Sequence, residues 1–389
     1  MRTFLWLFLV LAGWLGAVEP DSLISAQPSA NRGRVGIYRA ETGLGGYEYY
    51  VNANAYVPER PAGIHLFFHG QGGQKGAQHF HATERYFLRP HNLIGINMCY
   101  ADGDNMRDTI GKVRAAKIAV AQVIADYRIV VGRGVVASFS GGGLPHGQWW
   151  ASDGAKAGTA DFPFTHHALY SSNFFGAVSS TSRTSWFISV GIEEWTLADL
   201  GGTQSRVATQ VYQCARRNGT LDHDFRISGK GHTIPEEEIA RSAAGFARSD
   251  LALGPLLAAS EAPTPATRKY LDGANAQAIG PTLAALAAAL GKKGLDPANA
   301  AALNAIQARL QARVVAMTDL MERLAVEDPA LAAYYGQKFI ASLGKHEAAK
   351  VIGQRLVELG KTAEANACMQ AQATFIELFP KLFSGSPTL

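Results

Sequence analysis

The sequence predicts an α/β domain built on a mostly parallel sheet flanked by helices, followed by an all-helical domain. Between residues 35 and 227, short apolar runs alternate with segments of helical periodicity. This alternation is typical of parallel strands joined by helices that cover both faces of a sheet. Beyond residue 280 the chain is rich in alanine, and its apolar residues recur at steps of three and four, as in amphipathic helices. The 389 residues leave room for two or three domains.

The first 17 residues have the pattern of a secretory signal peptide. Arg2 precedes an apolar run over residues 4–12, and small residues follow at Gly16 and Ala17. The run is too short for a comfortable membrane span, and no later segment reaches about 18 apolar residues. We therefore expect a secreted or periplasmic protein with no stable membrane span after signal cleavage.

Charge and cysteine content exclude several classes of function. The formal net charge is +4, and no basic run concentrates it, so we expect no nucleic-acid partner. The three cysteines, Cys99, Cys214 and Cys368, show no CxxC spacing. The sequence therefore predicts neither a dense disulfide framework nor a thiolate zinc site, while a single Cys99–Cys214 disulfide stays open.

We expect no metal and no organic cofactor. His79, His81 and His91 are near one another in sequence, but no carboxylate or further histidine falls at a spacing known for zinc sites. The chain has glycine clusters at residues 70–73 and 141–143, and neither carries the GxxxxGK[ST] pattern of a phosphate-binding loop.

The strands expected in the first half differ in their degree of burial. Residues 35–38 and 47–57 alternate aromatic or β-branched residues with small ones around a glycine-rich turn, which predicts two paired strands. Residues 64–68 and 93–98 are short continuous apolar runs, as expected of strands that are buried on both faces.

The next segments continue the alternation of strand and helix. Apolar periodicity predicts a helix over residues 110–126. The remaining expected elements of this domain are a strand at 129–139, a helix at 144–151, strands at 166–171 and 186–190, a helix at 203–217 and a strand at 224–227.

A composition change near residue 260 separates the two expected domains. Prolines in the segment 260–265 indicate a linker, so we assign residues 18–255 to the α/β domain, 256–280 to a linker and 281–389 to the helical domain. Within the helical domain, the expected helices cover residues 303–324, 329–343, 346–359 and 363–379. Their role is unknown, and a protein partner is the hypothesis for this surface.

Ser140 lies in the segment of the α/β domain that is most informative about chemistry. The strand at 129–139 breaks into Ser140-Gly141-Gly142-Gly143 and then enters a helix. A serine at such a sharp strand-to-helix turn needs small residues two positions before and after it, and Ser138 and Gly142 satisfy this need. The turn would expose the hydroxyl, and the amide of Gly141 could donate to an oxyanion. A glycine-rich turn without chemistry is the alternative, because Ser138 replaces the usual glycine.

A second source of amide donors follows the strand at 64–68. The sequence His69-Gly70-Gln71-Gly72-Gly73 forms a loop at the same expected edge of the sheet, where Gln71 would supply its N–H. An ordinary turn is the alternative interpretation.

A serine nucleophile needs a histidine base and an acid that orients it. Glu193 and Glu194 follow the strand at 186–190, and His232 follows the strand at 224–227 through two glycines. The ordered set of serine, acid and histidine, each after its own strand, favours a catalytic site over three unrelated loop residues.

These segments resemble the α/β-hydrolase superfamily, and within it the secreted esterases related to polyhydroxybutyrate depolymerases and feruloyl esterases. The resemblance covers about residues 35–250, through HGQGG, SFSGGG, GIEEW and GKGH. It implies that Ser140 is the nucleophile, that His232 is the base, and that the amides of Gln71 and Gly141 form the oxyanion hole.

The resemblance also implies an acid three residues after the glycine that closes the preceding strand, which is Glu194 here. The superfamily more often has aspartate at this place, and Glu193 and Asp199 lie in the same loop as alternative acids. Trp195 directly follows Glu194 and is the candidate substrate-binding aromatic residue.

Taken together, the sequence predicts an exported serine carboxylesterase. We expect it to cleave a small or polymeric ester through a Ser-His-Glu triad and an acyl-enzyme intermediate. A serine peptidase or amidase on the same fold is one alternative, because the same side chains serve amide hydrolysis. A non-catalytic binding protein with this fold is the other.

Overall fold

We describe the protein from a computed structural model. The residues it describes are 26–71, 80–100, 108–174, 183–191, 193–194, 211–212, 222–229, 231–254, 257, 261–363, 365–367, 370–371 and 374. The expected signal peptide at 1–17, most of the expected helices at 203–217 and 363–379, and Cys214 therefore lie outside the described residues. The chain divides into two compact units, residues 1–246 and 247–389, and each is considered by itself.

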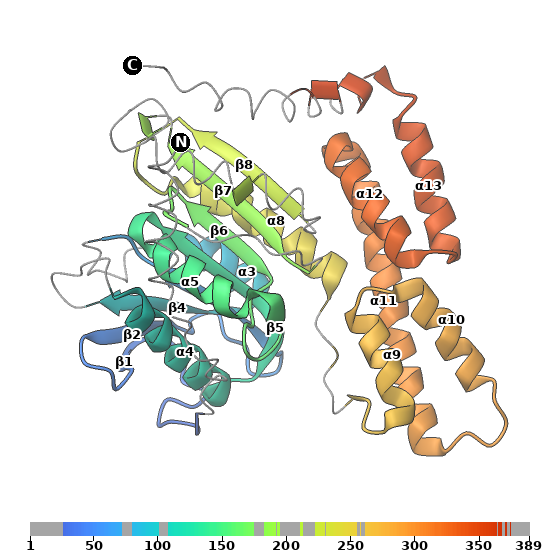
Figure 1. The fold of residues 1–389 in the computed structure, drawn as a ribbon, viewed down its shortest axis with the longest axis horizontal. Coiled ribbons are helices and arrows are strands. Elements are labelled where there is room, and N and C mark those ends of the chain that lie inside the picture. Colours follow the sequence, from blue (N-terminus) through green and yellow to red (C-terminus); the bar gives the residue numbers. More distant parts are fainter. Residues whose placement is uncertain are drawn as a thin grey trace, which may run out of the picture. The chain divides into compact units, whose positions relative to one another are not determined.

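The first unit is built on an eight-stranded sheet with the strand order β1-β2-β4-β3-β5-β6-β7-β8 (Figure 1). Among these strands β2 alone runs against the others, since β1 and β4 both pair with it antiparallel and all remaining pairs are parallel. This is the arrangement of the α/β-hydrolase fold, so the fold prediction is confirmed. The strands are β1 Ile37–Glu41, β2 Tyr47–Asn52, β3 Ala62–Phe68, β4 Leu93–Tyr100, β5 Ile129–Phe139, β6 His166–Tyr170, β7 Ser185–Gly191 and β8 Asp222–Ser228.

Helices cover both faces of this sheet, with α4 and α5 over one face and α3 and α8 over the other (Figure 1). Strand β5 shows why: Val135 and Ala137 pack in one core cluster with Phe246 of α8, whereas Ser138 bonds to His146 of α5 on the opposite face. The described helices of this unit are α2 Phe80–Thr83, a π-helical turn Glu84–Leu88, α3 Arg89–His91, α4 Thr109–Asp126, α5 Gly143–Asp153 and, up to residue 246, α8 Glu236–Leu253.

The parallel strands place four loops at one edge of the sheet. Residues 69–71 follow β3, and residue 140 follows β5. Gly191 ends β7, residues 193–194 come after it, and residues 231–232 follow β8. Because parallel strands all end at the same edge, these loops share the side of the sheet on which α/β proteins bind ligands.

The second unit consists of helices, as the sequence predicts. Asp296 and Asp328 cap α11 and α12 by accepting hydrogen bonds from the amides of Asn299 and Leu331, and each helix starts with a proline. None of the described helices is both long and apolar enough to cross a membrane. The helices are α9 Pro265–Asn275, α10 Ile279–Leu290, α11 Pro297–Glu327, α12 Pro329–Leu343 and α13 Glu347–Leu359.

Segment 256–280, which is expected from the sequence to be a linker, contains helix α9. Thr264 forms a capping box with Thr267, and Pro265 occupies the first helical position. The proline that suggested a linker therefore starts a helix, because its fixed φ suits the first turn, where its missing N–H is no loss.

Buried histidines give the sheet unit a dependence on pH. Burial lowers the pKa of His65 to about 3, and Nδ1 of this ring finds no hydrogen-bond partner among the described residues. The unfolded chain binds a proton at His65 near pH 6.5, whereas the folded chain stays neutral until about pH 3. The contribution of neutral His65 to the free energy of unfolding is therefore complete above pH 6.5. It is lost progressively as the pH falls from 6.5 towards 3.

We expect His65→Leu to weaken the acid sensitivity of the sheet unit. Between pH 7 and pH 5, the free energy of unfolding of the wild type should fall by about 2 kcal/mol more than that of the variant. Urea unfolding followed by tryptophan fluorescence measures this, since the four tryptophans beyond the expected signal peptide all belong to the sheet unit. Equal losses in both proteins would show that His65 is protonated in the folded state.

Candidate active site

Ser140 occupies a left-handed turn at the end of β5. Its φ is +50°, a conformation that few residues other than glycine adopt. Residues 140–142 form one 3-10 turn that continues directly into α5. A Cβ atom at Gly142 would overlap the carbonyls of Phe68 and His69, so only glycine fits there. This is the backbone geometry that a nucleophile elbow requires.

The loop after β3 lies against this serine. A Cβ atom at Gly70 would come within 2.9 Å of the Cβ of Ser140, so the absence of a side chain allows the two loops to meet. The buried His69 ring donates from Nδ1 to the carbonyl of Gly70, with 2.6 Å between the two atoms. In a trans peptide the following N–H points opposite to the carbonyl, so this bond fixes the direction of the Gln71 amide.

Gly141 supplies the second expected amide. It is buried and directly follows Ser140 in the turn that starts α5. N–H groups in a first helical turn lack intrahelical acceptors and carry the positive end of the helix dipole. Both sequence-predicted amides thus belong to segments adjoining Ser140, and such amides suit a developing negative oxygen.

The structure explains the serine that replaces the first glycine of the elbow motif. The buried Ser138 hydroxyl lies 2.9 Å from Nδ1 of His146 and 2.8 Å from Oγ of Ser172. Nε2 of His146 in turn lies 3.0 Å from Nδ1 of His167, which stacks on Trp186 at 3.9 Å between ring centroids. Burial lowers the pKa of His146 to about 3, so this network is uncharged at neutral pH.

Glu194 and His232 form a hydrogen-bonded pair at the same edge of the sheet. Nδ1 of His232 donates to Oε1 of Glu194. Oε2 of the carboxylate accepts from Oγ of Ser171 at 2.5 Å and from the amide of Gly191 at 2.8 Å. Burial alone would raise the pKa of Glu194, but these three hydrogen bonds outweigh it and hold the pKa below its usual value.

The bond to Glu194 also decides which nitrogen of His232 is available for chemistry. With Nδ1 donating, the neutral ring carries its lone pair on Nε2. The imidazole packs against Phe139, with 4.6 Å between ring centroids, and its side chain is 42% exposed. The ring therefore contacts the residue that precedes Ser140 and still has an open side.

The two alternative acids occupy different positions. Glu193 is exposed, and its carboxylate lies against Gly231 rather than forming the bond that Glu194 makes to Nδ1 of His232. Asp199 lies outside the described residues, and so does Trp195, the candidate substrate-binding residue.

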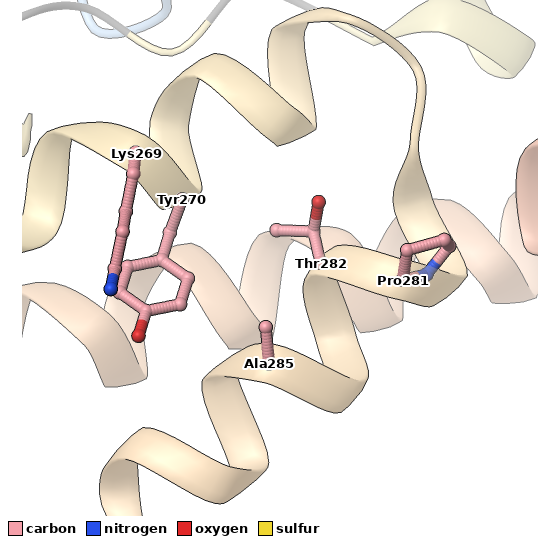
Figure 2. Close-up of a pocket in the computed structure, with 5 residues that line it drawn as sticks. All are labelled: Lys269, Tyr270, Pro281, Thr282 and Ala285. Atoms are coloured by element: carbon pink, nitrogen blue, oxygen red, sulfur yellow. The ribbon is translucent and has the colours of Figure 1, made fainter.

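Two hollows lie among the described helices of the second unit, and neither lining contains a carboxylate. One of them has a volume of about 290 Å³. Its lining residues, which Figure 2 shows, are Lys269, Tyr270, Pro281, Thr282 and Ala285, and none of these five carries an imidazole. Within the described part of the chain, no three histidine, cysteine or carboxylate side chains gather as metal ligands would, and His79 lies outside that part. The protein partner expected for these helices stays a prediction.

Three side chains near the site were not assigned a role from the sequence: His69, His146 and Ser171. His69 opens the HGQGG motif, and its position there is a signal that it is close to the site. His146 and Ser171 gave no such signal, because their contacts depend on which strands become neighbours in the sheet.

Comparison with known proteins finds similar solved structures. No family model and no curated protein matches the sequence. Among solved structures, a carboxylesterase from Mesorhizobium loti has a TM-score of 0.39 at 14% identity, over 52% of this chain and 94% of that one. A Bacillus cereus carboxylesterase has a TM-score of 0.40 at 10% identity, covering 54% and 97%. A siderophore hydrolase from Aspergillus nidulans has a TM-score of 0.38 at 14% identity, covering 59% and 99%. The α/β-hydrolase fold of this chain therefore rests on its strand order, and the candidate site rests on its geometry.

Proposed function

We propose that this protein is a serine hydrolase that cleaves carboxylic esters through Ser140, His232 and Glu194. The observation that carries the proposal is the left-handed Ser140 at the end of β5, at the same sheet edge as the Glu194–His232 pair. A serine in this strained turn, glycines that let two loops meet beside it, and a buried carboxylate on a histidine together match the needs of acyl transfer.

In the first half of the reaction, Oγ of Ser140 attacks the carbonyl carbon of the ester while Nε2 of His232 takes the hydroxyl proton. The carbonyl electrons move to oxygen, and the amides of Gln71 and Gly141 stabilise that oxyanion. When the carbonyl re-forms, the bond to the alcohol oxygen breaks. Nε2 returns the proton to this leaving oxygen, and the acyl group stays on Ser140.

In the second half, a water molecule replaces the alcohol. Nε2 of His232 takes a proton from the water, whose oxygen attacks the acyl carbon. The tetrahedral intermediate collapses, Ser140 regains its proton from Nε2, and the carboxylic acid leaves. One ester and one water thus become one alcohol and one acid, with the enzyme unchanged.

Glu194 serves both halves as a fixed negative charge. Its lowered pKa keeps it ionised across the neutral range, where it holds the Nδ1–H tautomer and stabilises the imidazolium that forms when Nε2 is protonated. Because the carboxylate is buried, water screens its attraction for the imidazolium only weakly.

We also propose that the protein is exported, because Arg2 and the apolar run at residues 4–12 form a signal-peptide pattern. The protein recovered outside the cytoplasm should begin at residue 18 when its N-terminus is sequenced. Recovery there of a chain that still begins at Met1 would contradict cleavage.

Ser140→Ala should abolish ester hydrolysis. We expect the rate on 4-nitrophenyl esters to fall about 10⁴-fold or more, since the remaining groups cannot form the acyl-enzyme. Ser152→Ala is the matched control, because Ser152 is exposed near the end of α5 and, among the described residues, bonds only to Trp149 and Asp153 of the same helix. Circular dichroism checks that all three proteins fold.

Two further outcomes of this experiment would redirect the proposal. Ser140-dependent turnover of amides without turnover of esters would indicate a peptidase or amidase. A folded wild type with no turnover and no labelling by a fluorophosphonate would indicate a binding protein.

A matched pair of substitutions tests which glutamate serves the histidine. Glu194→Gln should lower kcat by about 10³- to 10⁴-fold, because a neutral amide neither selects the Nδ1–H tautomer nor stabilises the imidazolium. Glu193→Gln should change kcat by less than about threefold, since Glu193 makes no such bond to Nδ1 of His232. Steady-state kinetics on one ester compares them, and the reverse ranking would assign the role to Glu193.

A further inference from the structure

Ser171 lies between the candidate nucleophile and the candidate acid. Strand β6 ends at Tyr170, which is in register with Phe139 of β5 on one side and Ser189 of β7 on the other. Ser171 is the residue that follows β6, and Ser140 is the residue that follows β5. This placement makes Ser171 the neighbour of the nucleophile across the sheet edge.

The backbone of Ser171 holds the nucleophile in place. Its carbonyl accepts a hydrogen bond from the amide of Ser140 at 3.1 Å, and its own amide donates to the carbonyl of Ser189 at 2.8 Å. Ser171 is itself left-handed, with φ of +43°. The two left-handed serines thus extend the pairing of β5 with β6 by one residue beyond the regular ladder.

The side chain of Ser171 holds the acid in place. Its buried hydroxyl donates to Oε2 of Glu194 at 2.5 Å, while the Gly191 amide donates to the same oxygen and His232 donates to Oε1. A carboxylate with donors on both oxygens has one favoured orientation, and that orientation aims Oε1 at the imidazole.

We propose that Ser171 is a positioning residue that fixes the Glu194 carboxylate, and through it His232, relative to Ser140. This inference rests on the proposed function, because it gives Ser171 a role in that same site. Glycine would adopt a left-handed backbone here at lower cost, so the hydroxyl is the property that serine adds. Its contact with Glu194 is the only hydrogen bond of that hydroxyl found among the described residues.

A double-mutant cycle on Ser171 and Glu194 tests this role. Ser171→Ala should lower kcat on a 4-nitrophenyl ester by about ten- to hundredfold with KM nearly unchanged, the effect of losing a hydrogen bond to a charged group. In the Glu194→Gln background the same substitution should lower kcat by less than about twofold, because the charge it orients is gone. A merely structural role would lower kcat equally in both backgrounds.

Two variants keep the test decisive. Ser172→Ala removes a buried hydroxyl from the next residue, but that hydroxyl bonds to Ser138 and not to the acid. Any loss that it causes should be equal in both Glu194 backgrounds. Ser171→Gly removes the hydroxyl while relieving the left-handed backbone, so it should behave as Ser171→Ala does even if the alanine variant folds poorly.

The outcomes separate this inference from the function it rests on. If Ser140→Ala retains the wild-type rate, the proposed function fails before the cycle begins. If the wild type works through Ser140 but the Ser171 effects are equal in both backgrounds, or absent in both, the proposed function stands and the role of Ser171 is overturned.

Discussion

The left-handed backbone at Ser140 is the constraint on which the rest of the site depends. A non-glycine residue in this conformation costs roughly 1–3 kcal/mol, which the surrounding structure has to hold in place. Here the amide of Ser140 bonds to the carbonyl of Ser171, and its carbonyl accepts from the amide of Asn173. Gly70 and Gly142 let the β3 loop close over the turn. The elbow is thus fixed by backbone contacts from two neighbouring strands.

The site also depends on the Glu194 carboxylate, which stays ionised although it is buried. Desolvation opposes the charge on Glu194, and donors from Ser171, Gly191 and His232 restore it. The nearby Ser138–His146–His167 network, in contrast, is buried without carrying a charge, because its polar members are neutral and bond to one another. Charge is therefore placed beside His232, and the polar network beneath the elbow contributes none.

Local sequence patterns predicted the strands and most helices well, because apolar periodicity reports burial directly. The helical segments at 80–91, α8 and α10 were not among the expected helices. Helix α8 begins with three consecutive glutamates, so its apolar face is sparse in sequence, and it is stabilised by packing of Ile239, Ala243 and Phe246 on the sheet. Tertiary burial supplied the stability that periodicity did not reveal. Helix α9 was hidden by the proline that starts it.

By itself, the sequence determined the order in which strands and loops follow one another along the chain, and hence which residues come after each strand. Ser140, the HGQGG loop and His232 could be singled out because small residues at a strand end are a local requirement of the turn. Only the tertiary structure decided that Glu194 rather than Glu193 meets Nδ1 of His232, since the Glu194 side chain is buried at this bond and the Glu193 side chain is exposed. It also brought Ser171 between Ser140 and Glu194, because β5, β6 and β7 are neighbours in the sheet. No local sequence pattern encodes the order of strands within a sheet.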